Sequence, residues 1–436
     1  MRRPLPRIGR VLAVDGLTVR VWSDGHVRTV AAPAPSTPPT PSLEPGDLCT
    51  LRSIDVDGDE AVWLARPQRD DVFAPDGDLS RMLANQGRRD AALRDRAALL
   101  TAIRAFFRRR DFLEVQTPAL ALCPGLEVHL DAIAVDVREG MGGAMVRRHL
   151  VTSPEFHCKR LLHAGLTRIY ALASAFRSGE RGGHHNPEFT MLEWYRAGQD
   201  SEAIIADVGE LIRRCAAAIT VDRKRRGEAR IVWRPRRALR LSFGTALQRF
   251  AGLRVSGTDE ASEAGAAGDS DIDGPPAPVP TLRARAERIG VATRDTDSAA
   301  DVLLAVFADR VEPALAAYEL VIVDRWPICL ASLARPLAHA PWLAERFEIY
   351  LRGVEIANGF GELVDGDEQR RRFESDLRQR RERSMPCYPI DERFLQALGR
   401  GCPPAGGVAL GVDRLLMALG GYDSIDDVVA FPFERA

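Results

Sequence analysis

Three acidic side chains in one short segment are the first candidates for chemistry. The segment ERFEIYLRGVEIANGFGELVDG contains Glu348, Glu355 and Glu362, and its strand-like residues predict a hairpin that turns at Arg352 and Gly353. A register that pairs Glu348 with Glu355 is available, although like charges facing each other destabilise a sheet. A divalent cation between them would offset this repulsion, because carboxylates and phosphate oxygens are typical ligands of Mg²⁺. We therefore expect a magnesium site here, with Glu362 nearby as a third acid.

A fourth acid, Glu193, lies in the strand-like segment EFTMLEWYR. Alternation along a strand places four side chains on one face: those of Phe189, Met191, Glu193 and Tyr195. Burying an unpaired carboxylate beside apolar groups costs several kcal/mol, roughly, so Glu193 needs a cation. That cation is either an internal arginine, such as Arg196 or Arg181, or the ammonium group of a ligand.

The segment VTSPEFHCKRLLHAG has the pattern of a helix start. Ser153 is a good N-cap residue, Pro154 suits the first helical position, and Glu155 complements the helix dipole in the first turn. Helix-start chemistry alone accounts for these three residues, so by themselves they do not require a ligand.

The segment GGVALGVDRLLMALGG predicts a strand, a glycine and then a helix with Arg414 in its first turn. An arginine there opposes the helix dipole. Its position is favourable if an anion docks beside it, where the arginine and exposed amides both face negative charge. The alternative is a salt bridge to Asp413 or Glu434.

Two regions of different character must position these side chains. Residues 7–67 contain five short strand-like runs, which predicts a small, OB-like β module over residues 1–75. Residues 77–110 have helical periodicity. Further along, strands and helices mix without a βαβ rhythm, which predicts an α+β domain with an antiparallel sheet over residues 76–436.

Two segments inside the second region have biased composition. Residues 256–280 are acidic, small and proline-rich, which predicts a disordered insertion. Residues 223–240 carry nine arginines or lysines. Such a run is typical either of a solvated face or of a contact patch for an acidic partner.

Composition excludes several classes of protein. Only two lysines occur, Lys159 and Lys224, and there is no GK[ST] string; a P-loop is therefore excluded, and arginines must bind the phosphates of any ATP. Seven scattered cysteines without CxxC spacing fit a reducing cytoplasm. The net charge of −1 gives no bulk attraction to nucleic acid. Neither a long apolar run nor a secretory pattern is present, so we expect a cytoplasmic protein without a membrane span.

Together these segments resemble the three signature motifs of class II aminoacyl-tRNA synthetases, in the form found in lysyl-tRNA synthetases. FFRRRDFLEVQTPAL resembles motif 1, with Pro118 as its proline, FR…HHNPEFTMLEWYR resembles motif 2, and GVALGVDR resembles motif 3. Within that group the chain is similar to the elongation factor P–(R)-β-lysine ligases through TSPEFHCKRLL, LEWYR and FEIYLRGVEIANGFGEL. The resemblance implies an antiparallel sheet flanked by helices and a homodimer formed through the motif 1 region.

The resemblance also implies how ATP and Mg²⁺ are bound. Arg177 and Arg414 would grip the phosphates and act in catalysis. Glu348 and Glu355 would hold Mg²⁺. The other residues implied to bind ATP are Glu180, Asn186, Ile356 and Gly411, together with Glu355 itself.

For a lysine-type substrate, the resemblance implies a second set of residues. Ser153 and Glu155 would meet the amine on the backbone side. The terminal ammonium would be bound by Glu193, Tyr195 and Glu362. Ala409 stands where lysyl-tRNA synthetases usually carry glycine, and in the family this alanine goes with β-lysine in place of α-lysine.

Two features depart from the family pattern. Motif 2 normally reads Arg-x-Glu, but here Arg177 is followed by Ser178, Gly179 and Glu180; the glutamate is either Glu180, one residue late, or missing. The β module at 1–75 is unexpected, because these ligases generally lack an anticodon-binding domain.

The activity implied is ATP-dependent activation of a lysine-type amino acid, (R)-β-lysine in the favoured interpretation, as an adenylate, followed by transfer to a lysine side chain of elongation factor P. Two alternatives stay open: a lysyl-tRNA synthetase that charges tRNA(Lys), and a catalytically silent synthetase paralogue that binds a partner or senses an amino acid.

Overall fold

The computed structural model describes most of the chain, in eleven stretches: residues 7–15, 18–23, 26–32, 43–45, 47–55, 58–65, 88–229, 233, 238–257, 274–401 and 403–436. Two compact units are formed, Met1–Arg96 and Ala97–Ala436, and each is described by itself. The predicted disordered insertion at 256–280 falls largely outside the described residues. So does part of the arginine-rich run at 223–240.

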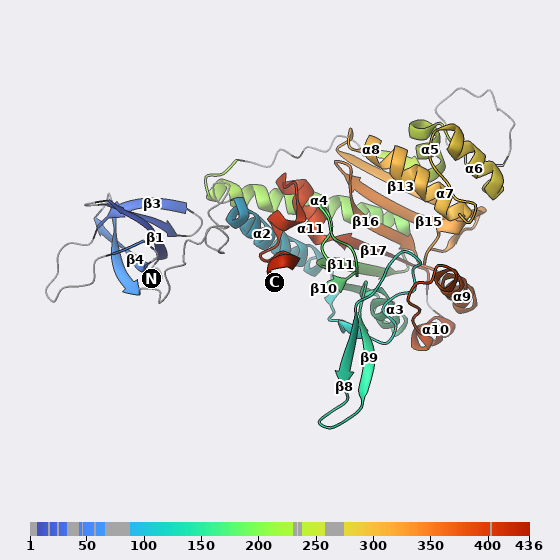
Figure 1. The fold of residues 1–436 in the computed structure, drawn as a ribbon, viewed down its shortest axis with the longest axis horizontal. Coiled ribbons are helices and arrows are strands. Elements are labelled where there is room, and N and C mark those ends of the chain that lie inside the picture. Colours follow the sequence, from blue (N-terminus) through green and yellow to red (C-terminus); the bar gives the residue numbers. More distant parts are fainter. Residues whose placement is uncertain are drawn as a thin grey trace. The chain divides into compact units, whose positions relative to one another are not determined.

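The N-terminal unit contains a closed barrel of five strands in the order β1–β2–β3–β5–β4 (Figure 1). The strands are β1 Arg7–Asp15, β2 Thr18–Ser23, β3 His26–Ala31, β4 Leu48–Asp55 and β5 Gly58–Ala65. Apolar side chains, which alternate along the strands except for Leu43 before β4, fill its interior: Val11, Val19, Val21, Val30, Leu43, Cys49, Leu51 and Ala61. The predicted barrel-like β module is confirmed.

The second unit is built on a nine-stranded sheet in which β12, β13, β15, β16, β17, β11, β10 and β6 are neighbours in that order, and β14 pairs with β15. The strands are β6 Leu113–Glu114, β10 Arg168–Phe176, β11 Glu188–Ala197, β12 Leu239–Ser242, β13 Leu320–Pro327, β14 Pro336–Leu337, β15 Ala340–Leu351, β16 Val354–Gly361 and β17 Ala405–Gly411. Only the pairs β12–β13 and β10–β6 are parallel. The predicted antiparallel α+β fold is confirmed.

A smaller sheet and the helices complete this unit. The small sheet has the order β7–β9–β8, with β7 Leu120–Ala121, β8 Ala134–Arg138 and β9 Met145–Leu150, and Figure 1 shows the β8–β9 hairpin extending away from the large sheet. The helices are α2 Arg88–Arg108, α3 Glu155–His163, α4 Ser201–Arg225, α5 Phe243–Ala251, α6 Val279–Arg288, α7 Ala299–Val306, α8 Glu312–Leu315, α9 Gly366–Glu382, α10 Glu392–Gly399, α11 Val412–Gly420 and α12 Ile425–Val428. None of the described helices is long and apolar enough to cross a membrane.

Two successive glycines of β17 let the two faces of the sheet pack differently. A Cβ on Gly406 would lie 2.7 Å from Ile204 Cγ1 of α4, and one on Gly407 would overlap the side chains of Glu362 and Tyr195. Side chains therefore approach the backbone of β17 closely from both sides. Helix α4 covers one face, and the acidic side chains named from the sequence gather on the other.

The β15–β16 hairpin corrects one prediction. Its turn lies at Arg352 and Gly353, as predicted, with both residues in the left-handed region at φ 52° and 79°. The turn places Leu351 opposite Val354 and Tyr350 opposite Glu355, and a bulge between Ile349 and Tyr350 then shifts the register by one residue, so that Glu348 lies opposite Asn358. The predicted pairing of Glu348 with Glu355 is therefore wrong, because the two-residue turn already pairs Glu355 with Tyr350 and the bulge moves Glu348 one residue further away.

Candidate active site

A cavity of about 320 Å³ on the open face of the sheet brings together most of the residues named from the sequence. Eleven of them line it: Ser153, Glu155, Arg177, Glu180, Asn186, Glu348, Glu355, Ile356, Ala409, Gly411 and Arg414. The other three, Glu193, Tyr195 and Glu362, are buried next to it. Residues more than 200 positions apart in the sequence therefore converge on one hollow.

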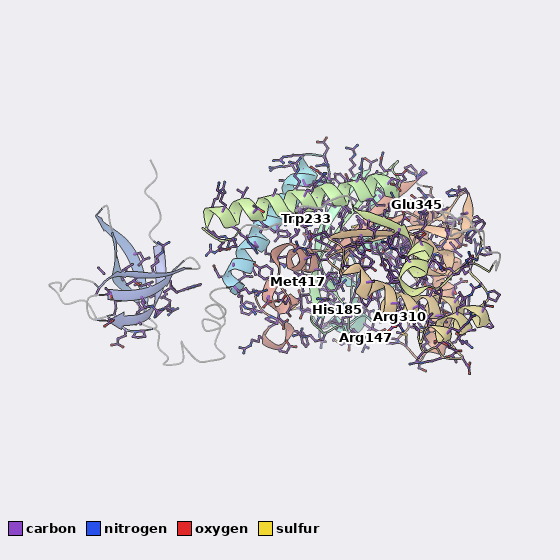
Figure 2. All side chains as sticks on the ribbon, turned by 90° about the horizontal axis from the view of Figure 1, so that it is seen from above. Arg147, His185, Trp233, Arg310, Glu345 and Met417 are labelled. Carbon is purple, nitrogen blue, oxygen red and sulfur yellow. The ribbon has the colours of Figure 1, made fainter. Side chains whose placement is uncertain are left out.

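Arg414 lies in the first turn of α11 and points into the cavity. Its Nη1 donates to Glu355 Oε2 at 3.0 Å, and its Nη2 lies 2.6 Å from Nε2 of His185, which is labelled in Figure 2. Burial lowers the pKa of His185, and Arg414 lowers it further, so the neutral ring can accept this hydrogen bond. The predicted alternatives for Arg414 are wrong: Asp413 accepts from the amide of Thr190, and the structure pairs Glu434 with Arg181.

Arg177, the arginine of the motif 2 segment, directly follows the end of β10 and lines the cavity. Its guanidinium lies 5.1 Å from the centre of the Phe189 ring, and its Nη1 lies 3.6 Å from Glu180 Oε1. Glu180 thus stands beside the arginine despite its shifted place in the sequence. The Nε of Arg177 and the Oδ1 of Asn186 are buried without a protein partner. One unused donor and one unused acceptor at a cavity wall fit a polar ligand such as a nucleotide.

Glu348 and Glu355 both line the cavity and interact electrostatically. Burial raises the pKa of Glu348 to about 7, with Arg346 opposing the rise and Glu355 adding to it. Arg346 and Tyr350 each donate to one oxygen of Glu348, at 2.6 and 2.5 Å. Within the described residues no three acidic, histidine or cysteine side chains form a complete metal cluster. Two carboxylates nevertheless suit Mg²⁺, which usually takes its other ligands from water and substrate phosphates.

Glu193 is fully buried in β11, and its oxygens accept hydrogen bonds from Ser153 Oγ at 2.5 Å and Tyr195 Oη at 2.7 Å. The internal arginines proposed for it bond elsewhere, Arg196 to Asp207 and Arg181 to Glu434. That alternative is therefore wrong, because the side chains alternate and Arg196 lies on the other face of the strand. Burial raises the pKa of Glu193 to about 8, and Glu155 adds to the rise.

Ser153 has a different part in the helix start from the one predicted. Helix α3 begins at Glu155 and Pro154 is its N-cap residue, yet the Ser153 hydroxyl accepts from the Glu155 amide at 3.0 Å. The same hydroxyl donates to Glu193. Ser153 therefore connects the start of α3 to the buried acid of β11.

Lys159 is a residue of this region to which the sequence analysis gave no role in the site. It is 2% exposed, and its Nζ lies 2.5 Å from both Glu155 Oε1 and Glu362 Oε2. Burial alone would lower the pKa of Lys159, but Glu155 and Glu362 outweigh burial and raise it. Two signals were present: Lys159 is four residues after Glu155, a spacing that brings helix side chains together, and it is one of two lysines in an arginine-rich chain.

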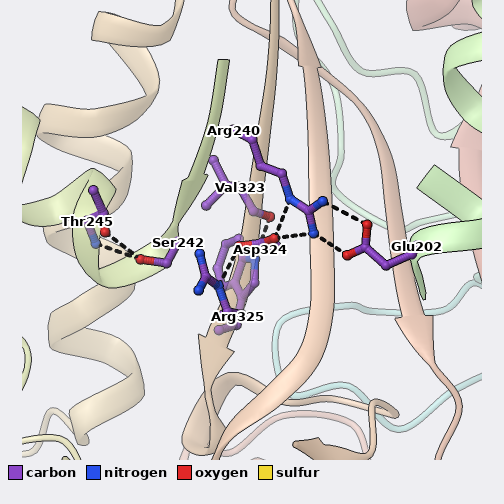
Figure 3. A network of polar contacts seen from close by, with 8 residues as sticks. Glu202, Arg240, Ser242, Thr245, Val323, Asp324 and Arg325 are labelled. Atoms are coloured by element: carbon purple, nitrogen blue, oxygen red, sulfur yellow. Dashed lines mark hydrogen bonds and ion pairs between the residues drawn. The ribbon is translucent and has the colours of Figure 1, made fainter. Parts of the chain in front are cut away.

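A second cavity, of about 670 Å³, shows that size does not identify the site. Its charged side chains bind one another: Arg240 lies between Glu202 and Asp324, and Arg325 donates to Asp324 at 3.1 Å (Figure 3). The smaller cavity differs because its walls include Arg177 and Asn186, each with a buried polar atom that has no protein partner.

Residues 81–435 match the family described as tRNA synthetases class II (D, K and N). The chain is 38% identical over 349 residues to the elongation factor P–(R)-β-lysine ligase of Yersinia enterocolitica. The aligned region covers 79% of this chain and 96% of that ligase. The chain is 39% identical over 350 residues to the ligase of the same name from Pectobacterium carotovorum, with the same coverage. The chain is a class II synthetase-like protein by fold and motifs. Within that class it belongs to the family of elongation factor P–(R)-β-lysine ligases, as the sequence motifs indicated.

The pKa of Glu193 leads to a prediction about stability. Between its unfolded value near 4.5 and its folded value of about 8, the folded state holds a proton that the unfolded state has lost. The free energy of unfolding therefore falls as pH rises through this window, by up to about 1.4 kcal/mol per pH unit. Glu193→Gln removes this pH-dependent loss of stability. The difference in melting temperature, variant minus parent protein, should therefore rise from pH 6 to pH 8 and then level off.

Thermal melts at several pH values test this, with Glu392→Gln as the control. Glu392 is exposed and pairs with Arg370, so that variant should show no such rise. A constant difference between Glu193→Gln and the parent protein across pH 6–8 would contradict the prediction.

Proposed function

We propose that this protein activates a lysine-type diamino acid, (R)-β-lysine in the first instance, and transfers it to a lysine side chain of elongation factor P. The observation that carries the proposal is the single cavity with Arg177, Arg414, Glu348 and Glu355 at one side and a carboxylate-lined slot next to it. The names of the related ligases support the same activity.

The nucleotide side of the cavity favours in-line attack on a phosphate. Bound ATP supplies the adenylyl group, and Glu348 and Glu355 would hold Mg²⁺, which would supply positive charge. Arg177 and Arg414 orient the phosphates and stabilise the charge that develops when a carboxylate oxygen of the amino acid attacks the α-phosphorus and pyrophosphate leaves. The other residues assigned to ATP binding are Glu180, Asn186, Ile356 and Gly411.

The slot favours a substrate with two ammonium groups. Ser153 and Glu155 are assigned to the amine near the carboxylate, and Tyr195, Glu193 and Glu362 to the terminal ammonium. A substrate that lacks an ammonium leaves a buried carboxylate without its partner, and polar sites of this kind discriminate by roughly 10⁴. Ala409, which lines the cavity opposite Glu193 in the sheet, is assigned to the choice between β- and α-lysine, where shape alone provides about 1–3 kcal/mol.

In the second step the free amine of the acceptor lysine attacks the activated carbonyl, AMP leaves, and the nitrogen loses a proton to give an amide. No nucleophilic side chain of this protein is needed, since the site acts by positioning and charge. We further propose a homodimer through the motif 1 region around Pro118. Leu113 and Leu122, which are 52% and 57% exposed there, support it, because exposed apolar patches mark contact surfaces.

The test is pyrophosphate exchange with ATP and each of α-lysine, (R)-β-lysine and (S)-β-lysine, followed by transfer to purified elongation factor P. Exchange should depend on the amino acid and be fastest with (R)-β-lysine, and the product should gain the mass of one β-lysyl group on a lysine. Robust charging of tRNA(Lys) with α-lysine would instead favour the synthetase alternative, in which the N-terminal barrel binds tRNA. Absence of exchange with all three amino acids would favour the remaining hypothesis, a catalytically silent synthetase paralogue.

A further inference from the structure

The loop between β7 and β8 of the small sheet brings a further acid to the cavity, Glu127, which none of the motifs includes. Glu127 lines the cavity, and its Oε2 is buried without a hydrogen-bond partner. Gly125 makes room for this carboxylate: it has φ 144°, and a Cβ at that position would lie 2.7 Å from Glu127 Oε2 and 2.6 Å from Thr152 Oγ1. The loop therefore combines a glycine-only conformation with an acid that faces the hollow.

The backbone of this loop is held in place from behind. The fully buried Arg380 of α9 donates to the carbonyl oxygens of Glu127 and Leu130 at 2.7 and 2.8 Å, and to Asp131 Oδ1 at 2.5 Å. The amide of Ser178, next to Arg177, donates to the carbonyl of Asp131 at 2.7 Å. The position of Glu127 is thus fixed relative to the arginine assigned to the phosphates.

Glu127 lies on the side of the slot that faces the cavity. It lines the cavity together with Arg177, whereas the buried Glu362 does not line it and pairs with Lys159. Burial raises the pKa of Glu127, Glu155 raises it further, and Arg177 and Lys159 oppose the rise. We therefore assign Glu127 to the side of the slot near the phosphate-binding arginine, and Glu362 to the side of the terminal ammonium.

The slot contains more acidic than basic side chains of its own. Glu127, Glu155, Glu193 and Glu362 face one lysine, and Lys159 already pairs with Glu155 and Glu362. A buried acid that faces a cavity without a partner either holds a proton or pairs with a cation from outside, and a bound ammonium group would favour its charged form. A diamino acid brings two ammonium groups, and the one near its carboxylate would reach the Glu127 end.

We propose that Glu127, together with Glu155, binds the ammonium nearest the substrate carboxylate and so selects diamino acids over acids that carry only the terminal ammonium. This inference rests on the proposed function and extends it by one specificity-determining residue. The two carboxylates form a clamp on an amine at the α or β carbon, next to the atom that is activated.

The test compares (R)-β-lysine with 6-aminohexanoate, which keeps the carboxylate and the terminal ammonium but lacks the second amine. In pyrophosphate exchange, Glu127→Gln should lower kcat/KM for (R)-β-lysine by about 10- to 100-fold, mainly through KM, because a charge-assisted hydrogen bond is lost. For 6-aminohexanoate kcat/KM should change by less than about twofold, because that ligand makes no such bond. The thermal stabilisation of the protein by (R)-β-lysine alone should shrink in parallel.

Asp376→Asn is the matched control. Its carboxyl lies close enough for Glu127 to raise the pKa of Asp376, to which burial contributes most, but it does not line the cavity, so selectivity should stay at the parent value. Equal losses for both ligands, or no loss for either, would overturn the role of Glu127. If Glu127→Gln does not fold, Glu127→Ala must show the same selective loss. Failure of the proposed function is distinct, because the parent protein would then show no exchange with (R)-β-lysine.

Discussion

Arg414→Ala should lower the rate of amino-acid-dependent pyrophosphate exchange by about 10²- to 10³-fold, the usual effect of removing one preorganised group that stabilises developing charge. Arg414 projects from the first turn of α11 to Glu355 and His185 at the cavity wall. The loss should appear mainly in kcat, because charge on the phosphates increases towards the transition state. Steady-state exchange with saturating ATP measures it.

Arg181→Ala is the matched control for this variant. Arg181 lies in the same motif 2 loop as His185 but pairs with Glu434 and Asp426 and does not line the cavity. Its removal should leave exchange within about twofold, since exposed ion pairs contribute little. If both arginine variants lost activity equally, the loss would arise from a general disturbance of the motif 2 loop, and the predicted role of Arg414 would be contradicted.

Lys159→Met should destabilise the protein by about 3–5 kcal/mol, the usual result of removing one partner of a buried ion pair. The change leaves Glu155 and Glu362 close together without their shared cation, at a place where Lys159 is almost completely buried. Methionine keeps nearly the same volume, so the cost arises from charge rather than from packing. Thermal and urea-induced unfolding of the C-terminal unit measure it.

A double-mutant cycle separates charge from shape in this cluster. Lys159→Met combined with Glu362→Gln should be more stable than Lys159→Met alone, because one of the two unpaired carboxylates is gone. Lys224→Met is the control, since Lys224 lies in the exposed last turn of α4 and should change stability by less than about 0.5 kcal/mol. Additive effects of the two substitutions would refute the coupling of Lys159 to Glu362.

The motifs of the catalytic unit were sufficient to predict its fold class and most of the named residues that line the cavity. Alternation predicts β11 and β17, and a glycine followed by a helix start predicts the position of Arg414, whereas most of the other site residues came from the resemblance to the synthetase family. The hairpin turn at Arg352 and Gly353 was equally visible. The pairing of the two strands was not: the turn brings Tyr350 opposite Glu355, and the bulge next to Tyr350 shifts the register by one more residue, which alternation along a strand does not reveal.

Partners of charged groups were predicted least well. Arg196 and Asp413 are close in sequence to the groups they were assigned to, but each bonds to something else in the folded protein. Sequence proximity is a poor guide here, since a strand sends successive side chains to opposite faces. Lys159 and Glu127 were missed because neither belongs to a signature motif.

By itself the sequence determined which residue types are available: arginines rather than a P-loop for phosphates, several acids for ammonium groups and a metal, and strands that alternate in the right places. Only the tertiary structure decided which of these groups meet. Burial removes water from the acids of the slot, so their charges must be balanced by whatever lies within a few ångströms. That balance, with Lys159 inside the slot and Glu127 facing the cavity without a partner, depends on contacts between distant segments that no local pattern contains.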